Sequence, residues 1–127
     1  MHQVLVVDDE PEYLDELVEA LEFRGLAAIS VGRGAGALEL LAREPAIRLV
    51  LTDIRMPDMD GVQLIEQARV AFPGRRFHFL VMTGHAAPVD IARAMNAGAE
   101  RCFPKPLAFE ELCDTMVELG GAGHAKV

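Results

Sequence analysis

The chain has 127 residues, of which 51% are hydrophobic and 25% are charged. This length and composition allow one sizeable hydrophobic core and exclude an intrinsically disordered protein. The formal net charge is −8, from 20 acidic and 12 basic residues, and the one basic pair, Arg75 and Arg76, stands alone. Such a surface would repel a phosphate backbone, so we expect no direct binding to nucleic acid.

Nothing in the sequence indicates a membrane segment or an export signal. Apolar runs are only a few residues long, which is too short to span a bilayer. The N-terminus lacks the basic, apolar and small-residue regions of a signal peptide, so we expect a cytoplasmic protein. Cys102 and Cys113 lie in apolar stretches, and we expect both to be reduced, mostly buried thiols.

Short apolar runs alternate with amphipathic stripes along the chain. Residues 4–7 form a continuous apolar run, typical of a strand buried on both faces. A helix stripe with the spacing i, i+3, i+4, i+7 follows, formed by Leu14, Leu17, Val18 and Leu21. The same alternation predicts further strands over residues 26–31, 47–52, 77–82 and 101–103. It predicts further helices over residues 34–43, 62–71 and 88–97, and a last helix with the stripe Phe109, Leu112, Cys113 and Met116.

Five strand–helix units in strict alternation predict an α/β fold, a five-stranded parallel sheet that is doubly wound, with helices on both faces. We expect a single domain over residues 1–127, with a core over residues 2–119 and a flexible, glycine-rich tail over residues 120–127. In such open sheets, ligands bind outside the carboxyl ends of the strands. The residues that follow each apolar run are therefore the candidates for function.

Chemically active side chains follow four of the predicted strands. Asp8 and Asp9 follow the first strand, Asp53 the third, Thr83 the fourth and Lys105 the fifth, so these groups would meet at one edge of the sheet. Crowded carboxylates need a cation, and a hard divalent ion such as Mg²⁺ prefers oxygen ligands, including a phosphate oxygen. A lysine can stabilise a phosphoryl oxygen as a point charge, and a carboxylate can attack phosphorus to form an acyl phosphate.

Asp53 is the candidate nucleophile because it is a single Asp at the end of a central apolar strand, whereas Asp8 and Asp9 form a pair suited to metal binding. Each residue alone also has a structural explanation. An Asp after a strand usually caps a helix or forms a turn, so Asp9 or Glu10 would cap the first helix and Thr83 the fourth. The convergence of these residues on one edge favours the chemical interpretation.

Several segments together form a specific signature: residues 4–10 (VLVVDDE), 51–61 (LTDIRMPDMDG), 82–85 (MTGH), and 97–99 (AGA) leading to 105–107 (KPL). With these segments in this order and spacing, the sequence resembles the receiver domains of two-component response regulators over residues 2–119. The resemblance implies a flavodoxin-like (βα)5 fold. It also implies that Asp53 accepts a phosphoryl group from a sensor histidine kinase or a histidine phosphotransfer protein.

The resemblance implies a metal site as well. Mg²⁺, or Mn²⁺, would be held by Asp8, Asp9, Asp53 and the backbone carbonyl of Arg55. Of the acidic pair, Asp9 would be the more direct ligand, and Asp8 would act at least partly through water.

Further site residues follow from the same resemblance. Thr83 and Lys105 would contact the phosphoryl oxygens, and the Lys105–Pro106 peptide bond would be cis. Receivers usually carry an aromatic residue three positions before this lysine, and that residue turns inward on phosphorylation. Here the switch position is Cys102, so the coupling would be weakened or would pass to Phe103.

Arg55 and His85 would flank the phosphoryl group, and in this family such positions tune its lifetime. Either side chain would alternatively pair with an acidic residue. The resemblance implies no enzyme activity beyond the protein's own phosphorylation and dephosphorylation, and a monomer or a phosphorylation-promoted dimer. A downstream protein would bind the surface of the fourth helix, the fifth strand and the fifth helix.

Three other functions are weaker matches. A haloacid-dehalogenase-type phosphohydrolase also uses a strand-end Asp and Mg²⁺, but would carry a second Asp where this chain has Arg55. A flavodoxin-like binder of flavin mononucleotide would need a phosphate loop after the first strand, where the acidic residues 8–10 would repel phosphate. A degenerate receiver would bind partners without phosphorylation, and the complete set of strand-end side chains argues against it.

Overall fold

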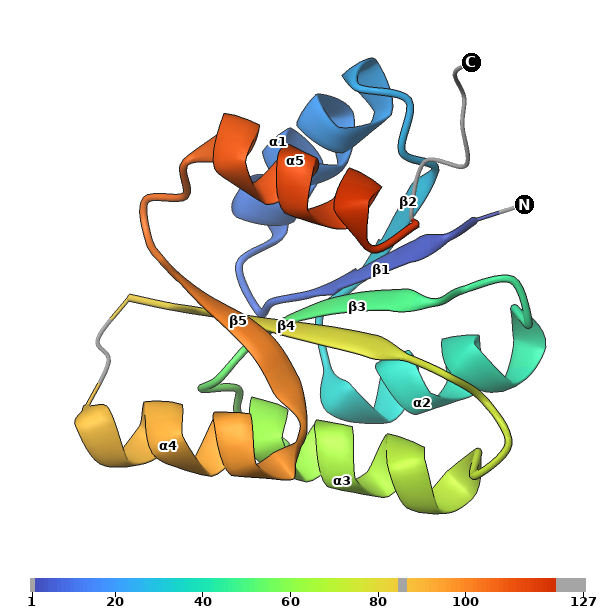
Figure 1. The fold of residues 1–127 in the computed structure, drawn as a ribbon, viewed down its shortest axis with the longest axis vertical. Helices are drawn as coiled ribbons and strands as arrows, with labels where there is room; N and C mark the ends of the chain where they lie inside the picture. The colour runs from blue at the N-terminus through green and yellow to red at the C-terminus, as the bar shows by residue number, and fades with distance from the viewer. Residues whose placement is uncertain (1, 85–86, 121–127) are drawn as a thin grey trace.

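The structure is a computed structural model that describes residues 2–84 and 87–120 (Figure 1). Five parallel strands form one sheet in the order β2-β1-β3-β4-β5. The strands are β1 (Val4–Val7), β2 (Ala28–Val31), β3 (Leu49–Asp53), β4 (His78–Thr83) and β5 (Ala99–Pro104). The helices are α1 (Pro11–Phe23), α2 (Gly34–Arg43), α3 (Gly61–Ala71), α4 (Pro88–Ala97) and α5 (Phe109–Glu118). This architecture confirms the predicted doubly wound, flavodoxin-like (βα)5 fold. From residue 121 on, the predicted tail lies outside the described residues.

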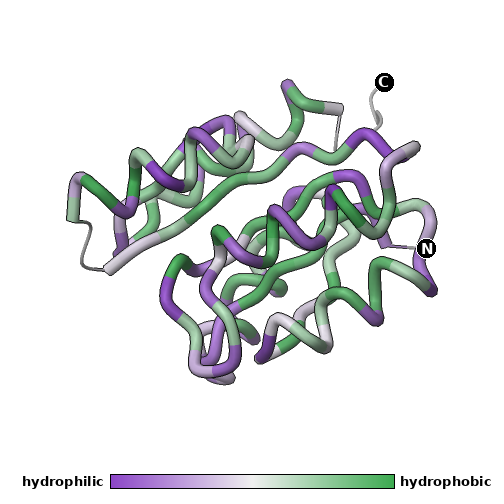
Figure 2. Tube along the Cα trace, turned by 90° about the horizontal axis from the view of Figure 1, so that it is seen from below, coloured by the Kyte–Doolittle hydropathy of each residue, from purple (hydrophilic) through white to green (hydrophobic). Residues whose placement is uncertain are grey.

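Helices cover both faces of the sheet. In Figure 1, α1 and α5 lie on one face, and α2, α3 and α4 lie on the other. The central strands β1 and β3 are buried along their whole length, and hydrophobic residues run along the strands in the interior (Figure 2). Because side chains alternate along a strand, Val4 and Val6 pack with α1 and α5, whereas Leu5 and Val7 pack with the other three helices. Each buried Leu or Val contributes about 1.5–3 kcal/mol, so the central strands hold their carboxyl ends firmly in place.

Four strands differ from the prediction in their bounds. β3 spans Leu49–Asp53 instead of residues 47–52, and β4 spans His78–Thr83 instead of residues 77–82. β2 begins at Ala28 rather than at residue 26, because the amide of Leu26 donates to the carbonyl of Leu21 and closes the end of α1. Gly25 permits this turn with a φ of 85°. β5 is longer than predicted, since it pairs with β4 from Ala99 to Pro104 through one register shift.

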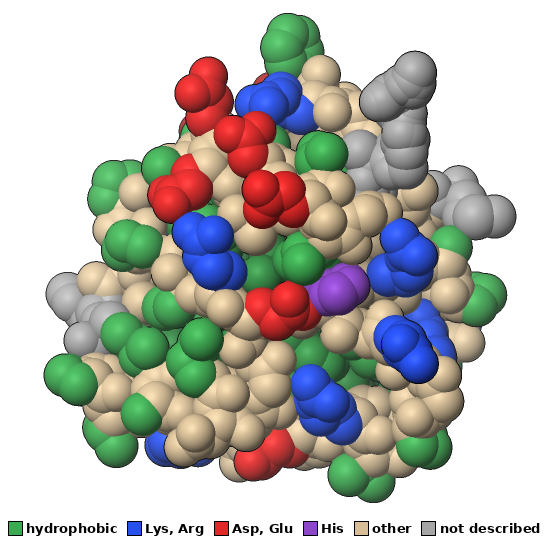
Figure 3. Space-filling model, in the orientation of Figure 1, with side chains coloured by type: hydrophobic (Ala, Val, Ile, Leu, Met, Phe, Trp, Pro, Cys, Tyr) green, Lys and Arg blue, Asp and Glu red, His purple; other side chains and the backbone are tan. Residues whose placement is uncertain are grey.

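The last helix departs from its predicted stripe at one residue. Phe109 is 38% exposed, because it is the first residue of α5 and lies at the rim of the core. Three other members of the stripe are buried as predicted: Leu112, Cys113 and Met116. Acidic side chains gather near α5 on the face shown in Figure 3. The helix itself carries four exposed acidic residues, Glu110, Glu111, Asp114 and Glu118.

The side chain of Arg75, one member of the basic pair, contacts other elements of the fold. The guanidinium of Arg75 donates to the backbone carbonyls of Leu41, Glu44 and Ile47, and it lies 4.7 Å from the centre of the Phe77 ring. Burial lowers the pKa of Arg75. Arg75 therefore joins the α2–β3 connection to the α3–β4 connection, and the described surface does not present the pair as a basic patch.

The N-terminus of α2 is capped by a side chain from another part of the chain. Arg33, which precedes α2, makes no side-chain cap. Instead, the carboxylate of Asp58 accepts hydrogen bonds from the amides of Gly34 and Ala35, at 3.1 and 3.0 Å. These bonds, that of Ala35 first, lower the pKa of Asp58 below its ordinary value of 3.8. The β3–α3 loop is thereby tied to the start of α2.

We expect Asp58→Ala to lower the free energy of unfolding at neutral pH by about 1 kcal/mol or less, because a capping interaction is lost at a solvent-exposed position. A carboxyl whose pKa is lowered by folding stabilises the fold above its unfolded pKa, and that stability is lost as the pH falls through the folded pKa. The difference from wild type should therefore shrink at acidic pH. Urea denaturation at several pH values checks this. Asp58→Asn, which keeps one acceptor oxygen, should be intermediate, and equal stability of wild type and Asp58→Ala at pH 7 would contradict the capping role.

Candidate functional site

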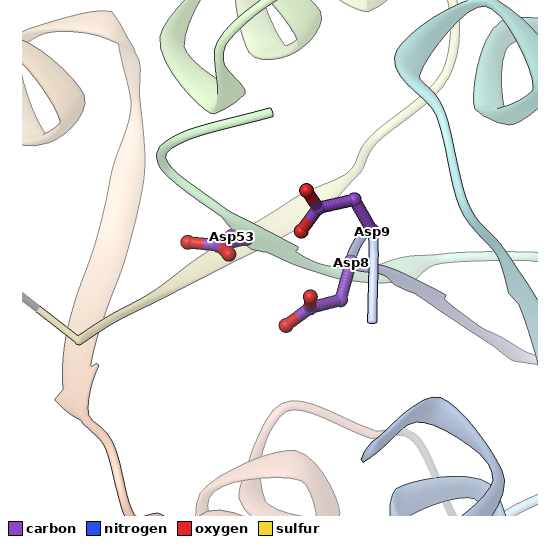
Figure 4. A group of neighbouring side chains, drawn as sticks. All are labelled: Asp8, Asp9 and Asp53. Atoms are coloured by element: carbon purple, nitrogen blue, oxygen red, sulfur yellow. The ribbon is translucent and has the colours of Figure 1, made fainter. Parts of the chain in front are cut away.

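The predicted strand-end residues meet at one edge of the sheet. Asp8 directly follows β1, and Asp53 ends the neighbouring strand β3, in the register that pairs Val7 with Thr52. Figure 4 shows Asp8, Asp9 and Asp53 extending beyond the strand ends toward the same side. Each of the three offers a carboxylate oxygen, and these oxygens lie within 4.8 Å of one another. Asp8 is fully buried, Asp53 is nearly so and Asp9 is exposed.

Lys105 brings a positive charge into this cluster from the far end of the sequence. Its ammonium Nζ lies 2.6 Å from Asp8 Oδ2, 3.2 Å from Asp53 Oδ2 and 3.7 Å from Glu10 Oε1. Its backbone amide donates to the carbonyl of Thr83, at 2.8 Å, which places the lysine beside the end of β4. The Lys105–Pro106 peptide bond is cis. The ammonium therefore bridges carboxylates on two strands.

Burial and charge act in opposite directions on the ionisable groups of the site. Burial raises the pKa of Asp53 above its ordinary value of 3.8, the Lys105 ammonium partly offsets this, and the charge of Asp8 raises the pKa further. Burial alone would lower the pKa of Lys105, but its hydrogen bond to Asp8 and the charge of Asp53 outweigh burial, and the pKa is raised. With Asp9 and Glu10 included, four carboxyl groups face one ammonium, so the cluster can accept a further cation.

A hollow of about 290 Å³ opens over Asp53, and its walls include Asp9, Arg55, Thr83, Gly84 and Lys105. The side chain of Thr83 is buried at the end of β4. A Cβ atom at Gly84 would meet nothing within 4 Å, so the chain leaves open space there. A larger hollow, of about 590 Å³, lies between α1 and α5 and is largely apolar. The smaller one is the chemical site because it alone of the two contains the carboxylate–lysine cluster.

Helix capping does not account for the strand-end side chains. Glu10 is the N-cap residue of α1, but its side chain makes no cap, and its amide instead donates to Asp8 Oδ1 at 3.0 Å. The N-cap residue of α4 is Ala87, four positions beyond Thr83. The alternative that Asp9, Glu10 or Thr83 caps a helix is therefore wrong.

The loop that follows Asp53 is held close by Gly61. A Cβ atom at Gly61 would lie 2.5 Å from the carbonyl oxygen of Asp53, a distance that real Cβ contacts do not show. The Gly61 amide donates to the carbonyl of Ile54, at 2.7 Å. Asp60 and Gln63 cap α3 reciprocally, each side chain accepting from the other's backbone amide. This close approach of α3 fixes the end of β3 and thereby the position of Asp53.

Arg55 contributes its backbone and its side chain in different directions. Its backbone amide donates to Asp53 Oδ1, at 3.3 Å. Its guanidinium pairs with Asp90 on α4, with Nη2 lying 2.8 Å from Oδ2, so the predicted pairing with an acidic residue is the one observed. The second residue predicted to flank the phosphoryl group, His85, lies outside the described residues.

The switch position and its neighbour lie on opposite faces of the sheet. Cys102 is half-buried and packs with the α2–α4 side of the core, where burial raises the pKa of its thiol. Phe103 is 2% exposed and packs on the α1–α5 side. The ring of Phe103 is therefore enclosed on the face opposite to Cys102, and the weakened or transferred coupling stays a prediction.

Sequence patterns alone did not indicate two other contacts of the site. The ring of Tyr13, in the first turn of α1, has its centre 4.9 Å from the Lys105 ammonium. Its hydroxyl is buried and has no hydrogen-bond partner among the described residues. The sequence did not single out Asp90 either, because an acidic residue in the first turn of a helix is ordinary. Only the position of Tyr13 one turn after the acidic pair could have suggested a role.

We expect Asp53→Asn to raise the free energy of unfolding at pH 7, without divalent cations, by on the order of 1 kcal/mol. A carboxyl whose pKa is raised by folding lowers the free energy of unfolding as the pH rises from the unfolded pKa to the folded one. The loss is about 1.4 kcal/mol per unit of difference between the two pKa values. Asn does not ionise, so the gain should vanish below about pH 3.8 and shrink when Mg²⁺ is added. Urea denaturation measures this, with exposed Asp114→Asn as the control. A less stable Asp53→Asn at pH 7 would show that the Lys105 contact outweighs burial.

None of the described helices is long and apolar enough to cross a membrane.

Two curated relatives of this chain are response regulators. The two-component response regulator PprB of Pseudomonas aeruginosa is 34% identical over 125 residues, which cover 98% of this chain and 46% of the relative. The response regulator MprA of Mycobacterium leprae is 34% identical over 110 residues, 87% of this chain and 47% of the relative. The chain thus spans about half the length of the curated relatives it matches.

Solved structures with the same fold agree with these relatives. A CheY-like response regulator receiver domain protein from Methanospirillum hungatei superimposes with a TM-score of 0.84 at 30% identity, covering 94% of this chain and 93% of that one. The signal receiver domain of an HD domain-containing protein from Pseudomonas fluorescens gives a TM-score of 0.83 at 26% identity, covering 92% of both chains. The family model for the response regulator receiver domain matches residues 4–117. The chain therefore belongs to the response regulator receiver domain family of two-component signalling proteins.

Proposed function

We propose that Asp53 accepts a phosphoryl group from a phosphohistidine of a sensor histidine kinase or a histidine phosphotransfer protein, and that this charge switches a protein-binding surface. The observation that carries the proposal is the buried cluster at the sheet edge, in which Lys105 lies between Asp8 and Asp53 below an open hollow. Membership of the receiver family supports the same reaction. The domain would extend over residues 1–127, with its core over residues 2–119.

In the proposed reaction, a carboxylate oxygen of Asp53 attacks the phosphorus of the donor. The new O–P bond forms as the P–N bond to the histidine breaks, and the imidazole leaves with the electron pair of that bond and takes up a proton. The Lys105 ammonium, 3.2 Å from Asp53, stabilises the charge on the phosphoryl oxygens. The hydroxyl of Thr83 donates to another of these oxygens from the wall of the same hollow.

The site also fits a hard divalent cation, Mg²⁺ or Mn²⁺. The donors are carboxylate oxygens within 4.8 Å of one another, and the carboxyl groups outnumber the one ammonium. Asp8, Asp9, Asp53 and the backbone carbonyl of Arg55 would hold the ion, with Asp9 the more direct ligand because it is exposed in the hollow. When bound, the ion would offset the charges of the carboxylates and of the incoming phosphoryl oxygens.

The output surface would be formed by α4, β5 and α5. Apolar side chains are exposed there, with Val89 63%, Met95 41% and Val117 48% exposed. The Arg55–Asp90 pair joins this surface to the residue two positions after Asp53. The protein would act on a cytoplasmic partner as a monomer or a phosphorylation-promoted dimer, without binding nucleic acid itself and without catalysis beyond its own phosphorylation and dephosphorylation.

Incubation of the protein with phosphoramidate and Mg²⁺ should add the mass of one phosphoryl group, detected by intact-protein mass spectrometry. The adduct should be absent in Asp53→Asn and should form at least tenfold more slowly in Lys105→Met, because a charge that stabilises the phosphoryl oxygens is lost. Asp114→Asn, an exposed carboxyl on α5, is the matched control and should behave as wild type. If the wild-type protein gains no phosphoryl group from phosphoramidate or from acetyl phosphate, it is a degenerate receiver. Continuous hydrolysis of unrelated phosphate esters would instead indicate a phosphohydrolase.

Phosphorylation should change amide hydrogen exchange over residues 88–119, which comprise α4, β5 and α5. The expected effect is faster exchange in the first turn of α4, because the added charge at Asp53 perturbs the contacts of Arg55 with this helix. Exchange with and without phosphoramidate measures the effect, and α2 serves as the internal control. Identical exchange across residues 88–119 in the two states would contradict the proposed output surface.

A further inference from the structure

Arg55 forms a wall between two hollows of the molecule. On one side is the hollow over Asp53, and on the other is a hollow of about 250 Å³ that Asp60, Asp90 and Arg93 also line. The backbone of Arg55 is bonded to the Asp53 carboxylate, whereas its guanidinium reaches into the second hollow. Arg55 thus has the carboxylate of Asp53 on one side and that of Asp90 on the other.

The two side chains of the Arg55–Asp90 ion pair differ in how much of their surface is exposed to solvent. The side chain of Arg55 is 70% exposed and that of Asp90 is 16% exposed. Asp90 is fixed at the third residue of α4, where the helix dipole favours a negative charge. It has a second cation, because Arg93 Nη1 lies 3.7 Å from Asp90 Oδ1 and Arg93 Nη2 lies 3.4 Å from Asp60 Oδ2. Arg55 can therefore leave Asp90 without stranding an unpaired carboxylate.

A phosphoryl group on Asp53 would compete for this guanidinium. It adds negative charge and three acceptor oxygens to the hollow that Arg55 already lines. A guanidinium binds such oxygens in a forked geometry at least as well as it binds a carboxylate. Exposed ion pairs contribute little free energy. The charge added by phosphorylation is therefore enough to draw Arg55 from Asp90 to the phosphoryl group.

We propose that Asp90 is a positioning residue that withholds the Arg55 guanidinium from the phosphoryl site, so that Asp90 and phosphorylated Asp53 compete for one cation. This inference rests on the proposed function. Its consequences are that Asp90 weakens binding of phosphoryl-like anions at Asp53, and that occupancy of the site loosens the contact of the β3–α3 loop with α4.

The test is the affinity for beryllium fluoride, a tetrahedral analogue of a phosphoryl group on a carboxylate, measured by NMR titration in the presence of Mg²⁺. Asp90→Asn should bind the analogue about two- to fivefold more tightly than wild type, the effect expected when an exposed pair stops competing. Arg93→Gln should bind it more weakly, because Asp90 then holds Arg55 alone. In an Arg55→Gln background, both effects should disappear.

The Nε–H resonance of Arg55 is a second readout that a merely structural role for Asp90 would not move. In wild type it should shift when the analogue binds, and in Asp90→Asn it should be displaced before any analogue is added. Thermal unfolding of each variant, followed by circular dichroism, verifies that it is folded.

The outcomes separate the two proposals. A wild-type protein that binds no beryllium fluoride and takes no phosphoryl group overturns the proposed function. Wild-type binding with an unchanged affinity in Asp90→Asn overturns the role of Asp90 alone. The same is true if Asp90→Asn tightens binding equally with and without Arg55, since the effect is then a general loss of negative charge. Because Arg93→Gln predicts a change of opposite sign, it keeps the inference testable if Asp90→Asn does not fold.

Discussion

The bridge of Lys105 to Asp8 and Asp53 is the interaction on which the site depends. Two strands buried on both faces end in carboxylates that water cannot fully hydrate, and such groups are costly unless a cation lies beside them. Lys105 supplies that cation from a position 97 residues after Asp8 along the chain, so the buried carboxylates gain this cation only once β1, β3 and β5 are all in the sheet. The site is thus assembled by the fold as a whole.

The same balance leaves the cluster short of positive charge. One ammonium is set against the carboxyl groups of Asp8, Asp9, Glu10 and Asp53, and the charge of Asp8 adds to the effect of burial in raising the pKa of Asp53. A cluster that is incompletely neutralised binds cations and electrophilic phosphorus more readily than a saturated one. Stability and function are opposed here, as they commonly are where charges are held ready for chemistry.

How much could be predicted from the sequence depended on whether a feature is local or arises between elements. The fold class, the bounds of β1, α2 and α4, and the convergence of the strand ends follow from periodicity and parallel topology. The length of β5 does not, because three of its residues are exposed and its pairing with β4 contains a register shift. The cap of α2 by Asp58 and the pairing of Arg55 with Asp90 join residues from different elements. The face occupied by Phe103 depends on the phase of β5, which the short predicted strand left open.

Tyr13 gives the molecule a property that the chemistry of the site does not require. It is the one tyrosine of a chain without tryptophan, and its ring centre lies 4.9 Å from the ammonium that bridges the carboxylates. The near-ultraviolet emission of the unmodified protein therefore comes almost entirely from a single fluorophore beside Lys105. Events that move this ammonium can be followed optically in real time, without a label and without altering a residue.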